Sequence, residues 1–256
     1  MAATRDSRQA HCLGIRLDAV TMDEAVDRCI EWCAADGPSR IVFPVNASIV
    51  VAMQNDAVLV AACEAADMRV ADGASLLWAA RLEGEILPER VAGIDLMQRL
   101  VERAVEKGLS LYFLGARAVV VGKLVEHYRA LHPGIRIAGF HDGYFGEPEH
   151  AGLVDAIRAS GAQILFIGMP TPFKEVWAEQ NRSRLGARLV LGVGGSFDVI
   201  AGFIPRAPVW MQRAGMEWLW RLLREPRRMW RRYLFGNARF VAMALTAAAR
   251  RIVGRV

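Results

Sequence analysis

Short apolar runs alternate along the chain with longer segments in which apolar residues recur every three or four positions. The short runs have the length and composition of buried strands, and the longer spacing is typical of helices that cover a core. We expect strands at 40–45, 68–71, 110–114, 135–140, 163–168 and 188–193. We expect helices at 47–66, 74–82, 93–107, 117–131, 149–160 and 172–185. This pattern predicts an α/β fold, a mostly parallel sheet with helices on both faces.

Polar and glycine residues follow every one of the predicted strands. Because the carboxyl ends of parallel strands meet at one edge of a sheet, where ligands bind, we expect these residues to share a site. Ordinary turns are the alternative, since Asp-Gly and Gly-Gly are favoured turn pairs. The residues are Asn46, Asp72, Gly73, Gly115, His141, Asp142, Gly143, Gly168, Lys174, Gly194, Gly195, Ser196 and Asp198.

The end of the chain differs in charge from the rest. Residues 206–256 hold twelve Arg and two Glu, a net charge of +10, whereas the other residues sum to −5 and the whole chain to +5. Two short helices at 215–224 and 226–235 and an amphipathic stretch at 238–256 are predicted there. One face of these helices would carry Arg221, Arg224, Arg228 and Arg232.

Four of the seven Trp residues also lie between residues 210 and 230, and Trp with Arg is typical of helices at a membrane surface. We therefore predict a core at 1–205 and a basic helical appendage at 206–256 that contacts the membrane. A contact within a homo-oligomer is the alternative function of this face. We expect no nucleic-acid partner.

The compartment follows from three observations. The first residues lack the apolar segment of a signal peptide, and the apolar run at 240–249 is about half of what a spanning helix needs. The four cysteines include no Cys-x-x-Cys pair, which favours packed thiols in a reducing compartment over a metal site. We expect a cytoplasmic protein, peripheral on the inner face of the cytoplasmic membrane.

Asp72 is the foremost candidate for a general base. It follows a strand directly, so its carboxylate should project into the cleft at the sheet edge and accept a proton from a substrate hydroxyl. The alternative is a helix N-cap, because Asp72 precedes the predicted helix 74–82 and Asp is a preferred capping residue.

Arg90 and Lys174 are candidates for binding a phosphate. Arg90 begins a loop that leads into a helix, although a solvated arginine would fit equally well, and Asp95 is expected to cap that helix. Lys174 lies in the first turn of a predicted helix, where the macrodipole does not favour a lysine, so we expect an anionic partner.

The glycine turn at Gly192, Gly194 and Gly195 suggests a phosphate cradle but lacks the dinucleotide fingerprint, because Phe197 stands where that motif has glycine. An NAD-type oxidoreductase would need that fingerprint. A non-catalytic module that binds a nucleotide or a membrane is the other alternative. The chain has no Asp-x-Asp sequence and no histidines at metal-ligand spacing, so we expect neither a metal nor a cofactor.

Taken together, these blocks resemble the WecG/TagA/CpsF family of bacterial glycosyltransferases over about residues 40–235. The segments that carry the resemblance are Asn46, Asp72 with its two neighbours, the sequence around Arg90, Phe113–Gly115, Asp142–Phe145, Gly168–Glu175, Gly192–Asp198, Arg206–Pro208 and Gly215–Leu223.

The resemblance implies a Rossmann-like core and a metal-independent, inverting transferase. Such enzymes move a sugar, commonly of the N-acetylmannosamine type, from a UDP-sugar to a polyprenyl-diphosphate-linked saccharide in cell-surface polysaccharide synthesis. Asp72 matches the family's proposed base, and Arg90 matches an arginine near the donor. The tail matches an appendage thought to bring arginines to the diphosphate, for which Arg213, Arg221 and Arg224 are the candidates here. Pro44 and Lys174 depart from the family's usual threonine and glutamine, which leaves the identity of the sugar open.

Overall fold

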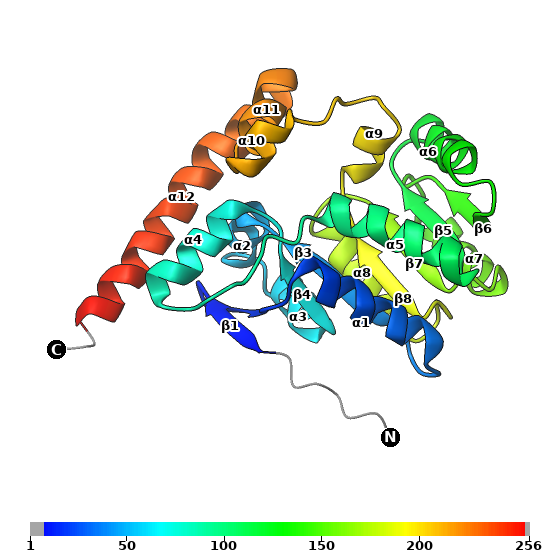
Figure 1. The fold of residues 1–256 in the computed structure, drawn as a ribbon, viewed down its shortest axis with the longest axis horizontal. Coiled ribbons are helices and arrows are strands. Elements are labelled where there is room, and N and C mark those ends of the chain that lie inside the picture. The colour runs from blue at the N-terminus through cyan, green and yellow to red at the C-terminus, as the bar shows by residue number, and fades with distance from the viewer. Residues whose placement is uncertain (1–7, 254–256) are drawn as a thin grey trace.

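The computed structural model describes residues 8–253, apart from the side chains of residues 147, 213, 227–229, 231–234 and 252–253. Its centre is a six-stranded sheet in which all neighbouring strands are parallel, in the order β4-β3-β8-β7-β5-β6 (Figure 1). The strands are β3 (Arg40–Val45), β4 (Met68–Ala71), β5 (Ser110–Gly115), β6 (Arg136–His141), β7 (Ile164–Gly168) and β8 (Leu189–Gly192). All six predicted strands are therefore present, within a residue or two of the expected bounds.

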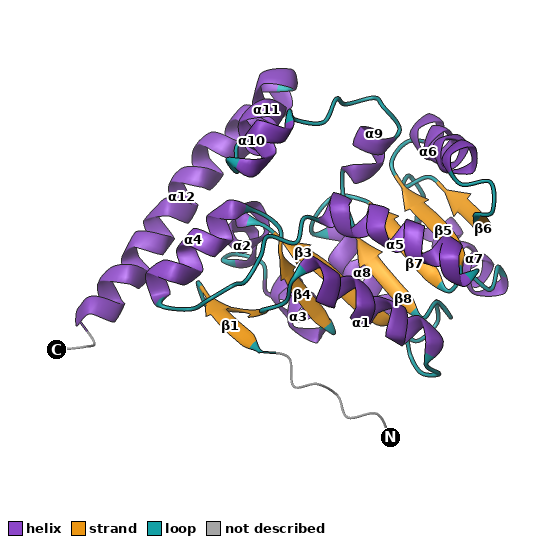
Figure 2. Ribbon diagram, viewed as in Figure 1, coloured by secondary structure: helices purple, strands orange, loops and turns teal. Residues whose placement is uncertain are grey.

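Helices cover both faces of the sheet because successive side chains of each buried strand point to opposite sides (Figure 2). Phe43 packs in one core and its neighbour Val42 in the other. One core includes residues of α1 (Met22–Ala34), α5 (Gly93–Lys107), α6 (Ala118–Leu131) and α9 (Ser196–Ile200). The other includes residues of α2 (Ala47–Met53), α3 (Ala57–Ala65), α4 (Ala74–Glu83), α7 (Glu147–Ala159) and α8 (Phe173–Asn181). The predicted α/β class is confirmed.

An N-terminal hairpin was not predicted. β1 (Gln9–Cys12) pairs with β2 (Ile15–Asp18) in an antiparallel ribbon, and Leu13 and Gly14 form its turn with φ of 53° and 79°. The sequence signal for it is an alternation of apolar and polar residues. Ala10, Cys12, Ile15 and Leu17 are buried in the structure, whereas their neighbours Gln9 and Arg16 are exposed.

The single helix expected at 47–66 is two helices, α2 and α3. The chain breaks at Asp56, whose side chain accepts a hydrogen bond from the Leu59 N–H at 2.9 Å and so starts a new helix. The expected helix at 172–185 ends earlier, because α8 stops at Asn181.

The C-terminal segment also differs from expectation. It forms α10 (Val209–Arg213), α11 (Glu217–Arg224) and a single 28-residue helix, α12 (Pro226–Val253), rather than a short helix followed by a separate stretch. Gly236 and Asn237 do not end α12, because Phe240 and Ala244 are buried and the helix packs along α2 and α4 (Figure 1). Within residues 8–253, no helix combines the length and the apolar character that crossing a membrane requires.

Candidate active site

The carboxyl ends of all six parallel strands open into one large cavity. Its volume is about 1790 Å³, above the roughly 300–1,000 Å³ typical of small-molecule pockets, so it has room for two substrates. The walls come from the segments that follow all six strands, β3 to β8, and from the C-terminal helices α11 and α12. The predicted edge of the sheet is thus where the cavity lies.

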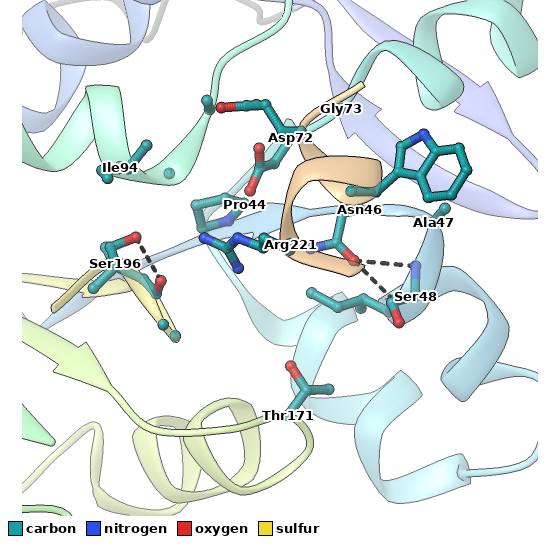
Figure 3. Close-up of a pocket in the computed structure, with 18 of the residues that line it drawn as sticks. Pro44, Asn46, Ala47, Ser48, Asp72, Gly73, Ile94, Thr171, Ser196 and Arg221 are labelled. Carbon is teal, nitrogen blue, oxygen red and sulfur yellow. Dashed lines mark hydrogen bonds between the residues drawn. The ribbon is translucent and has the colours of Figure 1, made fainter. Parts of the chain in front are cut away.

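Asp72 lies on the wall of this cavity directly after β4 (Figure 3). It does not cap α4, because the N-cap of that helix is Gly73, with a φ of 142° and no side-chain capping bond. The capping alternative is therefore wrong. The carboxylate instead accepts a hydrogen bond from the backbone N–H of Gly93, and both it and the guanidinium of Arg221 point into the pocket in Figure 3.

The electrostatic surroundings of Asp72 suit a proton acceptor. Burial raises the pKa of Asp72 from an ordinary 3.8 to about 6. Arg90 counteracts that rise, Glu217 adds to it, and Arg221 and the Gly93 hydrogen bond lower the pKa again. A carboxylate with such a pKa is ionised at neutral pH and holds a proton more readily than an ordinary aspartate does.

Arg90 is tied to the C-terminal segment. Its guanidinium forms an ion pair with Glu217 of α11 and lies 4.0 Å from Asp95. Asp95 is not the cap of α5, which is Ala92; its carboxylate accepts a hydrogen bond from Arg206 at 2.5 Å. These contacts hold α11 and the loop before α10 beside Asp72. No local sequence signal predicts them, because Arg90 and Glu217 are 127 positions apart.

Asn46 and Pro44 occupy the wall beside Asp72. Asn46 caps α2, since its side chain accepts hydrogen bonds from the N–H groups of Ser48 and Ile49 at 3.1 and 3.2 Å (Figure 3). A methyl group added at Gly93 would lie 2.9 Å from the ring of Pro44. Pro44 therefore requires a glycine at position 93.

The glycine turn after β8 faces the same cavity. Gly194 has a φ of 53°, in the left-handed region that favours glycine, and the hydroxyl of the buried Ser196 donates to the Val193 carbonyl at 2.8 Å. A methyl group added at Gly195 would lie 3.8 Å from Nη1 of Arg221. Asp198 lines the cavity from the first turn of α9.

Lys174 is buried and already has an anionic partner within the chain. Its ammonium group forms an ion pair with Glu175 and donates a hydrogen bond to the Thr171 hydroxyl. Thr171 in turn donates to Glu175 at 2.9 Å. The expected anion is thus, in this structure, a neighbouring glutamate, and a donor contact by Lys174 stays a prediction.

Gly115 and Asp142 do not lie on the described wall, although Gly143 does. A methyl group at Gly115 would lie 2.5 Å from the Gly168 carbonyl carbon, so this glycine allows β5 and β7 to approach closely. Asp142 accepts a hydrogen bond from the Tyr144 N–H at 2.8 Å and stabilises the turn. Asp142 thus has the turn role that the sequence left open as the alternative, and donor contact by either residue stays a prediction.

The three candidate arginines of the tail have different settings. Arg221 points toward Asp72 and the Gly195 turn. Arg224 is exposed at the cavity margin, with its guanidinium 4.6 Å from the centre of the Trp220 ring. The side chain of Arg213 lies outside the described residues, as do those of Arg228 and Arg232.

The chain is similar to known glycosyltransferases. The sequence model of the Glycosyl transferase WecG/TagA/CpsF family matches residues 10–253. A protein of Bacillus spizizenii (strain ATCC 23059 / NRRL B-14472 / W23), "N-acetylglucosaminyldiphosphoundecaprenol N-acetyl-beta-D-mannosaminyltransferase", is 36% identical over 186 residues, which span 72% of this chain and 70% of that protein. These matches favour neither the NAD-type oxidoreductase nor the non-catalytic module. The chain belongs to the WecG/TagA/CpsF family of glycosyltransferases.

Proposed function

We propose that this enzyme transfers an N-acetylmannosaminyl group from a UDP-sugar to N-acetylglucosamine linked to a polyprenyl diphosphate, with inversion and without a metal ion. The observation that carries the proposal is the pairing, in one cavity, of the Asp72 carboxylate with the Arg221 guanidinium and the Gly194–Gly195 turn. The name of the Bacillus relative supports the choice of sugar and acceptor.

The proposed reaction uses Asp72 as the base. It takes the proton of an acceptor hydroxyl while that oxygen forms a bond to the anomeric carbon and the bond from this carbon to the UDP oxygen breaks. Attack from the face opposite UDP inverts the anomeric centre. Arg221 and the backbone of the glycine turn, which lie together at the cavity wall, would stabilise the negative charge on the departing diphosphate.

An assay of the purified protein tests the proposal. We expect UDP release from UDP-N-acetylmannosamine only when N-acetylglucosaminyl-diphosphoundecaprenol is present, with a β-linked disaccharide as product. A product that retains the anomeric configuration of the donor would contradict the proposed role of Asp72. If UDP is released from a different UDP-sugar and not from UDP-N-acetylmannosamine, the proposed donor is wrong.

The activity should depend on pH through Asp72. Because the base must be unprotonated and burial places its pKa at about 6, kcat/KM is expected to fall as pH decreases through that value. Glu217 raises the pKa of Asp72, so Glu217→Gln should move this midpoint to lower pH. Glu106→Gln, at an exposed side chain of α5, is the control and should leave the midpoint in place. If the midpoint stays in place or rises in Glu217→Gln, Asp72 is not the group whose protonation lowers kcat/KM.

We propose further that the enzyme works at the inner face of the cytoplasmic membrane, where a polyprenyl-linked acceptor resides. The net charge of +10 over residues 206–256 supports contact with anionic lipid. Binding to anionic vesicles that weakens as salt rises would test this contact. Because α12 supplies Phe240 and Ala244 to the core, removing residues 206–256 would also expose apolar surface, so salt dependence in the full chain is the cleaner measurement.

A further inference from the structure

The cavity continues from Asp72 and Arg221 into an apolar groove between α4 and α12. The two helices supply ten of its lining residues, of which only Ser75 and Asn237 are polar and none is charged. Ala79, Phe240 and Ala244 are buried in its floor. The walls are formed by Trp78 and Leu82 on α4 and by Val241 and Leu245 on α12.

The four wall residues are large apolar side chains left in solvent. They are between 47% and 66% exposed, and each helix contributes two of them one turn apart, so that both pairs line one groove. Single exposed apolar residues need no explanation, but a contiguous set that lines a cavity indicates a binding surface for an apolar group. The groove, defined here by these four residues, has no occupant among the described residues.

The groove has a fixed direction relative to the reacting groups. α4 begins two residues after Asp72, and the loop before α11 packs on that end, since a methyl group at Gly215 would lie 2.6 Å from Cβ of Ala74. At the other end Arg251 of α12 donates to the Leu82 carbonyl at 3.3 Å. The helices therefore run side by side away from Asp72 (Figure 1), and eight residues of α4 give a groove of about 12 Å.

One cavity thus offers a cationic, polar end and an apolar extension, which is the pattern that fits a phosphorylated lipid. Arg224 lines the margin of the polar end beside Arg221, and the acceptor's diphosphate would lie there, next to the departing diphosphate of the donor that we assign to Arg221. We propose that the α4–α12 groove holds the first isoprene units of the acceptor's polyprenyl chain and so aligns its sugar with Asp72. This inference rests on the proposed function for the identity of the acceptor, and it concerns the tail rather than the transferred sugar.

Binding of two soluble diphosphates tests the groove without any sugar transfer. Geranylgeranyl diphosphate and dimethylallyl diphosphate share a head group and differ only in chain length, and both are used below their micellar concentrations. We expect the full-length protein to bind the longer one at least about tenfold more tightly, because more apolar surface leaves water. Equal affinity for the two would overturn the proposal.

Charged substitutions on either wall should remove the preference. In Leu82→Glu and in Leu245→Glu the two diphosphates are expected to bind with similar affinity. Both leucines are exposed, so the changes should not unfold the protein, and unfolding temperatures check this. Leu131→Glu, at an equally exposed leucine at the end of α6, is the matched control and should keep the preference. A preference that persists in both wall variants contradicts the proposal.

Two other occupants give different results. If the groove meets the bilayer, Leu245→Glu will weaken vesicle binding while the chain-length preference persists, which overturns the proposal. If a second copy covers it, the variant will lower the oligomeric mass with the preference unchanged, which also overturns it. Failure of UDP release in the wild-type assay would overturn the proposed function alone, because the binding comparison needs no donor.

Discussion

Asp72→Asn should lower turnover by about 10²–10⁴ while leaving UDP binding nearly unchanged. Asparagine has almost the same shape as aspartate and can still accept the Gly93 hydrogen bond, but it cannot take the proton of an acceptor hydroxyl. The loss should therefore appear in kcat and not in the affinity for UDP. Steady-state UDP release and calorimetric titration with UDP measure the two quantities separately.

Asp155→Asn is the matched control for this substitution. Asp155 lies on α7 with a 70% exposed side chain, so the same chemical change there should keep wild-type turnover. Wild-type turnover by Asp72→Asn would remove Asp72 from the role of base. Loss of UDP binding together with turnover would indicate a donor contact instead.

The stability of the Asp72→Asn protein provides an independent check. The folded pKa of about 6 lies above the ordinary 3.8, so the folded state binds more protons and the stability contributed by Asp72 decreases as pH rises through this window. Above this pH window the buried charge of Asp72 lowers the stability of the folded protein, and a neutral asparagine does not have this effect. We expect the variant to unfold at the same or a higher temperature at pH 7.5, which separates lost chemistry from lost folding.

The sequence predicted the sheet because its strands are continuous apolar runs, and it predicted the cavity because parallel strands end at one edge. It predicted that a helix begins at residue 226, but not that α12 continues through Gly236 and Asn237, which read locally as a break. Packing of Phe240 and Ala244 on α2 and α4 overrides that local preference. Local patterns therefore predicted the elements buried on both faces better than the helix that lies across the cavity.

The candidate site shows the same division between local and distant information. The position of Asp72 on the cavity wall was predicted correctly, because its place directly after a strand is a local feature. The pairing of Lys174 with Glu175 depends on side-chain direction, and that of Arg90 with Glu217 joins distant segments. The apolar groove was also missed, because Trp78, Leu82, Val241 and Leu245 come from two helices whose packing the sequence does not specify.

Arg221 and Arg224 lie three positions apart on α11, and the sequence offers no reason to prefer one. The structure separates them. Arg221 influences the pKa of Asp72 and approaches Gly195, whereas the guanidinium of Arg224 stacks on Trp220 at the cavity margin. The difference leads to unequal expectations for two otherwise identical substitutions.

Arg221→Ala is expected to reduce kcat/KM by about 10²–10³, or 2.7–4 kcal/mol of barrier, because it removes a cation aimed at the departing diphosphate. Arg224→Ala, the matched change three residues away, should cost less than about tenfold, because an exposed guanidinium is screened by water. Arg221→Lys should recover only part of the loss, since an ammonium group keeps the charge but not the planar fork that binds two phosphate oxygens. Equal losses in the two alanine variants would show that α11 supplies charge without a specific contact, and would leave the Gly194–Gly195 turn as the remaining candidate for holding the diphosphate.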